Sequence, residues 1–329
     1  MLEISLQDYI TAYVANADDV ATAQESADDA VTAWKRAVEE KQARLTVEEL
    51  KNTADVRQMA LRETTNNAVI SAVQAYASLG QSERDLDAKR VALTVANEKL
   101  RVARLRYSAG LVTEDSVMQQ ESSSISAQDA LVKAENSFKQ ARQSFCEKIG
   151  VPVADKIVLT TDVSGLYTGI GDYDREATLE AARKASSNYF SAAAAEDLAR
   201  RKYEALNDPM IATQTEMKSA QKTYEDAKEK LESAEKSIIT SVDDALATLA
   251  SLKRSLDMAI IDAELAVKNL DVAKIKFNHG EMLQYELDSQ VSSASQSQYR
   301  AVQARADVFV QILKIHVLTG GDAMSLIGK

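Results

Sequence analysis

The stretch Arg104-Leu105-Arg106-Tyr107-Ser108-Ala109-Gly110-Leu111-Val112-Thr113-Glu114-Asp115-Ser116-Val117 decides the fold of this chain. Gly110 follows a helical turn rich in arginine, and a glycine of positive φ commonly ends a helix at such a place. Thr113 or Asp115 can then cap the helix that follows. The stretch therefore predicts the tip of a hairpin made of two long helices.

A leucine heptad runs into this tip from the N-terminal side. The spacing is that of a coiled coil, with Tyr107 next in line after Leu79, Leu86, Leu93 and Leu100. A second apolar stripe on another face of the same helix consists of Val91, Val95, Val102 and Leu105. A helix with two seams packs against two neighbours, so the pattern predicts a bundle or a ring of helices.

The chain contains the tip twice, at an offset of 170 residues. The segment Lys274-Ile275-Lys276-Phe277-Asn278-His279-Gly280 repeats the segment that ends at Gly110, type for type. The register holds without a gap from 71–150 to 241–320, and nineteen of these eighty positions are identical. We expect a first helical-hairpin repeat over residues 1–160, a connector over 161–173 and a second repeat over 174–329.

The other boundaries follow from caps and helix breakers. Ser5 with Asp8 predicts a capping box that opens a helix from about Leu6 towards Arg44, and Thr46 with Glu49 predicts a second capping box. From there the pattern predicts a long helix over 47–107, a return helix over 114–149, a short strand over 157–161, a helix from about 173 to a break at 207–209, and the repeated hairpin over 215–319.

Composition favours an elongated all-α protein and excludes several classes. The chain has only two prolines and ten glycines, which suits long helices. A net charge of −11 repels nucleic-acid phosphate, so we expect no nucleic-acid partner. The lone Cys146 lies in an apolar helical stretch and is expected to be a buried, inert thiol. No catalytic, cofactor or metal-binding motif is found, and the histidines are His279 and His316.

The sequence carries no signal for insertion into a membrane. No apolar run approaches the ~20 residues of a membrane-spanning helix, and Met1-Leu2-Glu3-Ile4-Ser5 lacks the regions of a signal peptide. The chain is thus expected to be a mature or trimmed form, or a protein that stays inside the cell.

The duplicated hairpins and the tip from Gly110 to Val117 resemble the TolC family of outer membrane efflux proteins. The openings Ile4-Ser5-Leu6-Gln7-Asp8-Tyr9-Ile10 and Ala177-Thr178-Leu179-Glu180-Ala181-Ala182 share this resemblance. It implies a homotrimer whose hairpins form a hollow α-barrel. It also implies a place in the cell envelope, on the periplasmic side of the outer membrane, within an efflux pump or a type I secretion system.

The resemblance also assigns residues to partners. In the family, the tips dock a periplasmic adaptor (membrane fusion) protein, which links the channel indirectly to an inner-membrane transporter. Carried onto this chain, the docking positions are Gly110, Leu111, Val112 and Thr113, and Gly280, Glu281, Met282 and Leu283. The family narrows its periplasmic mouth with acidic side chains. Here Glu286 falls on such a position, and Asp288 lies beside Ser289, the next one along the helix, while Asp115 is acidic in the first copy.

One feature of the family is absent from the sequence. Its members insert two membrane-spanning β-strands in each half, and such a strand needs ~9–11 residues of alternating polarity. Residues 41–53 and 207–215 hold no such segment, so this chain is either a shortened form or a natural relative without the strands.

Two other interpretations remain open at this stage. Asp115, Glu286 and Asp288 can equally be helix-start charges that the helix dipole favours, and Tyr107 and Phe277 can be apolar plugs of the hairpin ends. At the level of function, the alternative to an export conduit is a structural or pore-forming coiled-coil bundle.

Overall fold

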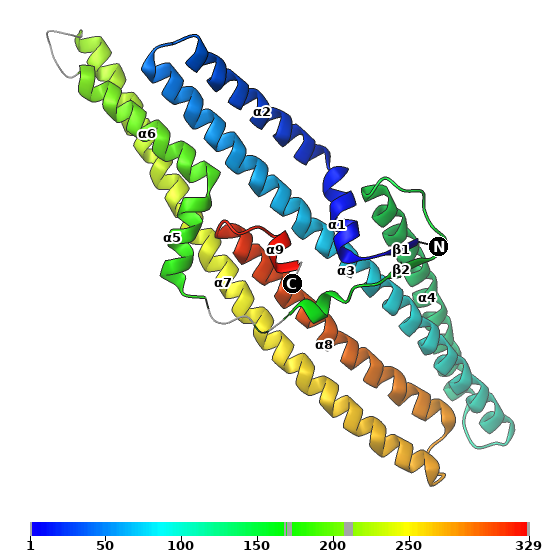
Figure 1. Cartoon of the computed structure of the whole chain (residues 1–329). Coiled ribbons are helices and arrows are strands. Elements are labelled where there is room, and N and C mark those ends of the chain that lie inside the picture. Colours follow the sequence, from blue (N-terminus) through cyan, green and yellow to red (C-terminus); the bar gives the residue numbers. More distant parts are fainter. Residues whose placement is uncertain (1, 168, 170–172, 207–212, 328–329) are drawn as a thin grey trace. The chain divides into compact units, whose positions relative to one another are not determined.

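The computed structural model describes residues 2–167, 169, 173–206 and 213–327, and within them the chain is all-α apart from one short strand pair (Figure 1). The first half contains α1 (Leu6–Ala15), α2 (Asp18–Glu39), α3 (Arg44–Ser108) and α4 (Glu114–Lys148). The second half contains α5 (Arg175–Ala185), α6 (Ser187–Leu206), α7 (Gln214–Asn278), α8 (Gln284–Leu318) and a last turn, α9 (Met324–Ile327).

The offset of 170 residues holds for the long helices. Helices α3 and α7 are each 65 residues long, and α4 and α8 are each 35 residues long. In both pairs the first and last residues are 170 positions apart. At 1.5 Å per residue, α3 and α7 are each roughly 100 Å of helix. The all-α hairpin fold predicted from the sequence is confirmed.

The two strands join the N-terminus to the segment that follows α4. β1 (Leu2–Ile4) pairs in parallel with β2 (Ile157–Leu159), with Leu2 opposite Ile157. The Tyr76 hydroxyl donates to the carbonyl of Ile4 at 3.0 Å and accepts from the amide of Thr161 at 3.1 Å. β2 was predicted, two residues longer, whereas β1 was not.

An aromatic cluster beneath these strands forms the core around the start of the chain. The rings of Tyr9 and Phe145 stack with centroids 4.0 Å apart, and the ring of Tyr76 lies 5.9 Å from that of Tyr9. All three side chains are buried, as is the neighbouring thiol of Cys146. The expected burial of Cys146 is confirmed.

The first helix is shorter than predicted. It begins after Ser5 as expected, because the Ser5 hydroxyl accepts from the amide of Asp8 at 3.1 Å and donates to its carboxylate at 2.6 Å. However, it ends at Ala15, and α2 begins at Asp18. No proline or glycine marks this break, so the hydrophobic pattern runs through it. Two aspartates, at 18 and 19, open α2, where the helix dipole favours negative charge.

The predicted capping box of Thr46 and Glu49 is also wrong, because α3 already begins at Arg44. The α2 helix is followed by Lys41, whose φ is 55°. The amide of Gln42 donates to Ala37 and the amide of Lys41 donates to Val38, which is the Schellman pattern usually made by glycine. Because the residue in this conformation is a lysine and not a glycine, nothing in the sequence marked the turn at this position.

In the second half, a tertiary contact divides the helix predicted to start near Tyr173. Ser186 separates α5 from α6, and the Glu63 carboxylate of α3 accepts from both the amide and the hydroxyl of Ser187 at 2.8 Å. The break predicted at Asn207-Asp208-Pro209 lies outside the described residues.

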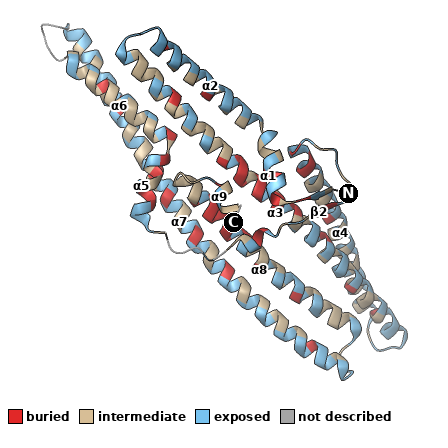
Figure 2. Cartoon of the chain, viewed as in Figure 1, coloured by how far each residue is buried: buried red, intermediate tan, exposed pale blue. Residues whose placement is uncertain are grey.

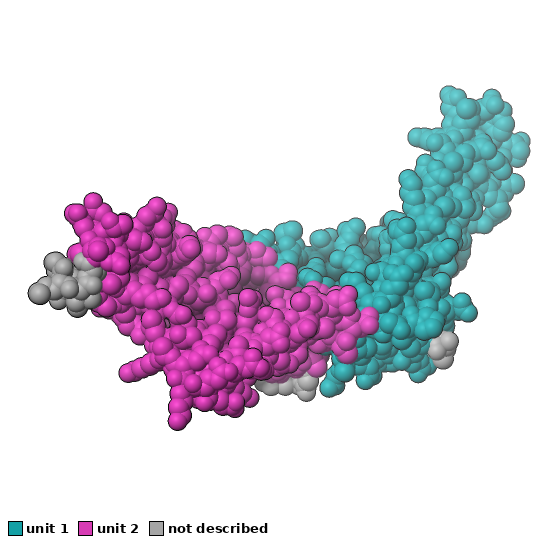
Figure 3. All heavy atoms as spheres, turned by 90° about the horizontal axis from the view of Figure 1, so that it is seen from above, with its two compact units in different colours: residues 1–12, 72–168, 251–310 teal, residues 13–71, 169–250, 311–329 magenta. Residues whose placement is uncertain are grey.

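The chain forms two compact units, coloured in Figure 3. Unit 1 comprises residues 1–12, 72–168 and 251–310, and unit 2 comprises residues 13–71, 169–250 and 311–329. Each unit takes residues from both repeats. The boundaries 1–160, 161–173 and 174–329 therefore stay a proposal about the duplication in the sequence.

Unit 2 has a small core and a set of ion pairs between helices. Its core includes Leu179, Ala182, Ile238 and Val242. The Arg175 guanidinium of α5 makes two hydrogen bonds to Asp243 of α7, at 2.6 and 2.9 Å. These hydrogen bonds hold the pKa of the Asp243 carboxyl below its usual value. In the same way, two hydrogen bonds from Arg201 lower the pKa of Glu48.

The leucine heptad is buried, as predicted, over the part of α3 that lies further from the tip. Figure 2 shows buried residues recurring along the long helices. Leu79 and Leu86 are buried on α3, as are Leu249 and Leu256 at the equivalent positions of α7. Leu93 and Leu100 are half-buried. The two copies therefore bury the same face of the long helix.

The hairpin tips and the groove between them

Both predicted tips end their long helix with the same hydrogen bonds. At the first tip, the amide of Gly110 donates to Tyr107 and the amide of Leu111 donates to Arg106, both at 2.9 Å. At the second tip, Gly280 donates to Phe277 and Glu281 donates to Lys276, again at 2.9 Å. This is the Schellman motif, which satisfies carbonyls that a helix end leaves free.

The two tip glycines are required by backbone conformation and not by lack of space. Their φ angles are 73° at Gly110 and 75° at Gly280, a region that side chains disfavour. A Cβ added at either position would meet nothing within 4 Å. A side chain here would therefore strain the turn and project from the tip without disturbing any packing.

The helices that leave the two tips begin in different ways. Thr113 stands at the N-cap of α4, as predicted, but its side chain makes no capping hydrogen bond. At the start of α8, the Glu286 carboxylate accepts from the amide of Leu283 at 2.8 Å. Glu286 therefore occupies the helix-start role that the sequence left open.

Most of the expected docking residues are exposed. Leu111 is 74% exposed, which is unusual for a leucine, and Leu283 is also exposed. Val112 and Met282 are half-buried, whereas Gly110, Thr113, Gly280 and Glu281 are exposed. Tyr107 is 47% exposed, so the idea that it plugs the hairpin end is wrong for the single chain. Phe277 is half-buried.

Unit 1 brings the two tips together around one groove of about 680 Å³. Among the predicted docking and mouth residues, its wall includes Val112 from the first tip and Glu281, Met282 and Glu286 from the second. The other predicted tip residues, Gly110, Leu111, Thr113, Asp115, Gly280, Leu283 and Asp288, do not line it. The duplicated tips are thus neighbours, and only part of each faces the other.

The groove wall also carries basic side chains that sequence reasoning missed. Lys99, Arg106 and Lys276 line it together with Tyr285. Arg106 and Lys276 stand at equivalent positions of the two repeats, so a basic charge kept in both copies was the signal that could have found them. With Glu281 and Glu286 in the same lining, the groove presents both signs of charge and a few apolar side chains. Such a lining suits the binding of another protein's surface.

The two other acidic residues predicted for the periplasmic mouth, Asp115 and Asp288, lie outside the groove lining. Asp288 accepts a hydrogen bond from the Gln284 side chain at 2.8 Å, and Asp115 is exposed in the first turn of α4.

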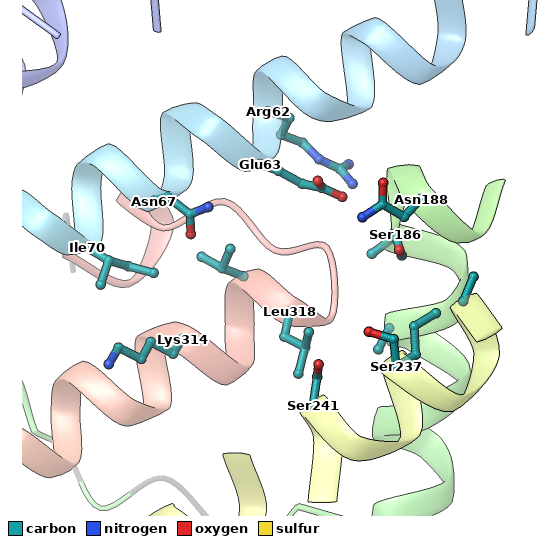
Figure 4. A pocket seen from close by; sticks show the side chains of 15 residues that line it. Arg62, Glu63, Asn67, Ile70, Ser186, Asn188, Ser237, Ser241, Lys314 and Leu318 are labelled. Atoms are coloured by element: carbon teal, nitrogen blue, oxygen red, sulfur yellow. The ribbon is translucent and has the colours of Figure 1, made fainter. Parts of the chain in front are cut away.

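A second cavity, of about 390 Å³, lies within unit 2 (Figure 4). Figure 4 shows Arg62 and Glu63 of α3 extending towards Ser186 and Asn188, at the junction of α5 and α6. Glu63 is already bonded to Ser187, so the acidic group of this cavity serves to hold the start of α6.

The described residues also bear on two other classes of site. They contain no group of three or more His, Cys, Asp or Glu side chains placed to hold a metal ion. In that same part of the chain, every helix is too short or too polar to be a membrane span.

Sequence comparisons identify no relative of this chain. No protein-family model matches it, and no curated protein does. Solved structures do match, over nearly its whole length. The outer membrane protein VceC from Vibrio cholerae has a TM-score of 0.65 and 16% identity, with 96% of each chain covered. The outer-membrane channel OprN has a TM-score of 0.69 and 11% identity, over 97% of this chain and 90% of that one.

A third structure, the open state of the MtrE outer membrane channel from Neisseria gonorrhoeae, has a TM-score of 0.56 and 13% identity. The match covers 97% of this chain and 89% of that one. At such identities the likeness concerns the fold. The chain has the TolC-like fold of these outer membrane channels.

Proposed function

We propose that this chain is the subunit of a trimeric export conduit in the cell envelope, which docks a periplasmic adaptor protein through its hairpin tips. The observation that carries the proposal is the pair of equivalent glycine tips, adjacent in unit 1, on a TolC-like fold. The solved channels of this fold are outer membrane proteins, which supports a place on the periplasmic side of that membrane.

In this proposal the tips supply recognition and no catalysis. The exposed Leu111 and Leu283 offer apolar contacts, and the groove between the tips offers charges of both signs. The adaptor in turn would connect the conduit to an inner-membrane transporter. We propose that the acidic side chains Asp115, Glu286 and Asp288 narrow the periplasmic mouth of the conduit.

The docking proposal is tested by placing aspartate on both tips. We expect Gly110→Asp with Gly280→Asp to abolish binding of the purified adaptor from the same bacterium, measured by biolayer interferometry. The far-UV circular dichroism should be unchanged, because the added side chains meet nothing within 4 Å.

Gly169→Asp is the matched control for this experiment. Gly169 has a φ of 75° and open space around it, as the tip glycines have, but it lies in the connector. This variant should bind the adaptor normally. Undiminished binding by the double tip variant would remove the docking proposal.

The assembly is tested by light scattering on the purified chain. A trimer has three times the chain mass of 35.9 kDa. A persistent monomer at high concentration would instead favour the structural bundle over the conduit.

A further inference from the structure

The cavity of about 390 Å³ in unit 2 has an apolar part and a polar part (Figure 4). Its buried lining is apolar and comes from three helices, with Ile70 of α3, Ala182 and Ala185 of α5, and Ile238 of α7. Its exposed lining is polar and includes Arg62, Asn188 and Ser241. Small-molecule sites usually have volumes of ~300–1,000 Å³, an apolar lining and a few polar groups that orient the ligand. The cavity has all three features.

Arg62 supplies this cavity with a positive charge that the chain itself leaves unpaired. In the part of the chain that the structure describes, its guanidinium group makes no hydrogen bond and no ion pair. The Nη2 atom lies 3.6 Å from the place where a Cβ of residue 320 would stand, so the group sits at the C-terminal end of α8. Figure 4 shows the side chain extending from α3 towards Ser186 and Asn188. A guanidinium in this state can donate two parallel hydrogen bonds to an oxyanion.

The other two charged lining residues, Glu63 and Lys314, limit the charge of a ligand at this place. Glu63 follows Arg62 in the chain, and its two carboxylate oxygens accept from the amide and the hydroxyl of Ser187 at 2.8 Å. This carboxylate remains an anion next to the site, so it disfavours a second negative charge on the ligand. Lys314 does not offset it, because its ammonium group points away from Arg62 in Figure 4. The charges therefore suit a monoanion such as a carboxylate better than a phosphate.

Uncharged polar side chains add hydrogen-bond donors to the same cavity. Two amides and two hydroxyls line it, those of Asn67, Asn188, Ser237 and Ser241. Within the described residues, none of these four side chains hydrogen-bonds to another group of the protein. Figure 4 shows the Asn188 side chain directed towards that of Arg62. Amide and hydroxyl groups donate to a carboxylate without adding charge, so they complete a site that one cation begins.

The duplication of the hairpins does not account for the charges of this cavity. By the offset of 170 residues, Arg62 and Glu63 of α3 correspond to Glu232 and Ser233 of α7. The second long helix thus carries a negative charge where the first carries the arginine. The repeated hairpin does not require a cation at this position, and the arginine makes no ion pair that would explain it as part of the folding of unit 2.

We propose that the cavity of unit 2 binds a small organic carboxylate with an apolar body. The carboxylate accepts hydrogen bonds from the Arg62 guanidinium and the Asn188 amide, and the apolar body covers Ile70 and Ile238. Burial of that body against the two isoleucines supplies most of the affinity, and the arginine selects for the charge. The site lies within one chain, so it depends neither on the number of copies nor on an adaptor.

Isothermal titration calorimetry of octanoate into the purified full chain tests the class of ligand. We expect saturable binding of one octanoate per chain with a Kd on the order of 0.1–1 mM, which the size of this ligand allows. 1-Octanol has the same apolar chain and no charge, and it should bind at least tenfold more weakly. Absence of saturable octanoate binding, or equal affinity for the two compounds, would overturn the proposal.

The role of the arginine is tested by Arg62→Gln, with Arg57→Gln as the matched control. Arg57 is also an exposed arginine of α3, but it does not line the cavity. Arg62→Gln should weaken octanoate binding at least tenfold, because the carboxylate loses its cation. Arg57→Gln changes the net charge of the chain by the same amount and should bind as the unmodified chain does. Equal affinity of both variants for octanoate would overturn the site.

The place of the apolar body is tested by filling the cavity from α7. Ser241→Leu puts a larger side chain into the cavity and should remove the heat of octanoate binding. Ser251→Leu is the matched control, since Ser251 is also exposed on α7 but does not line the cavity, and it should leave binding unchanged. Both variants should keep the far-UV circular dichroism of the chain, because leucine is a good helix former. Undiminished binding by Ser241→Leu would place octanoate elsewhere on the molecule and overturn the site.

Discussion

At the residue scale, the glycines that end the long helices do two different jobs. Gly110 adopts positive φ in open space, whereas Gly320, which ends α8 with a φ of 86°, is also crowded. A Cβ at Gly320 would lie 2.9 Å from the Cβ of Ala185, closer than carbon atoms pack. One glycine is thus selected by conformation alone, and the other by conformation and space.

This difference predicts unequal costs for the same substitution. Gly110→Ala should lower the free energy of unfolding by about 1–2 kcal/mol, the cost of a left-handed conformation for a side chain. Gly320→Ala should lower it by about 1–3 kcal/mol more, because it also overpacks the contact with α5. Urea unfolding followed by circular dichroism measures both, and equal losses would contradict the role assigned to the crowding at Gly320.

At the scale of elements, the Tyr76 hydroxyl links α3 to the strand pair. It donates to Ile4 of β1 and accepts from Thr161 just after β2. Because this hydroxyl belongs to a buried side chain, its loss would remove that partner from the part-buried amide of Thr161 and leave the carbonyl of Ile4 with its bond from the Thr160 amide at 3.1 Å. The parallel pair of three-residue strands has few other hydrogen bonds that could compensate for this loss.

We therefore expect Tyr76→Phe to destabilise this region by about 1–3 kcal/mol. Hydrogen exchange should become faster at the Thr161 amide, while exchange in the middle of α7 stays unchanged. Tyr107→Phe, at the exposed tip, serves as control and should alter neither. Unchanged protection of Thr161 in Tyr76→Phe would show that the hydroxyl does not hold the strands.

The elements also show which features the sequence could predict. Both bounds of α4 and the start of α7 agree with the predicted ones within one residue, because heptads and Schellman glycines are local signals. A helix break near Arg44 was predicted, but its exact place at Lys41 was missed, because a lysine stands there where glycine is usual. The break at Ser186 was missed because it depends on Glu63. The tips were predicted for the same local reasons. The groove was not, because it requires the second hairpin to lie beside the first.

At the scale of the whole molecule, helix α7 has one apolar face buried within the chain and another apolar face exposed. On α7, Leu256 is buried within the chain, whereas Ile261, five residues further on, is 63% exposed. Burial within the chain stabilises the monomer, and an exposed apolar side chain contributes only when another surface covers it. In the proposed trimer, the two positions would therefore separate the stability of one chain from the affinity between chains.

Alanine at each position tests this separation. Leu256→Ala should lower the free energy of unfolding of the dilute monomer by about 2–5 kcal/mol, because it leaves a cavity in the heptad core. Ile261→Ala should change that quantity by less than about 0.5 kcal/mol but weaken assembly measurably in sedimentation experiments. Both variants keep α7 helical, since alanine is the best helix former. If Ile261→Ala left assembly unchanged while Leu256→Ala reduced it, the face exposed in the single chain would have no part in holding copies together, and assembly would depend on the fold of each chain alone.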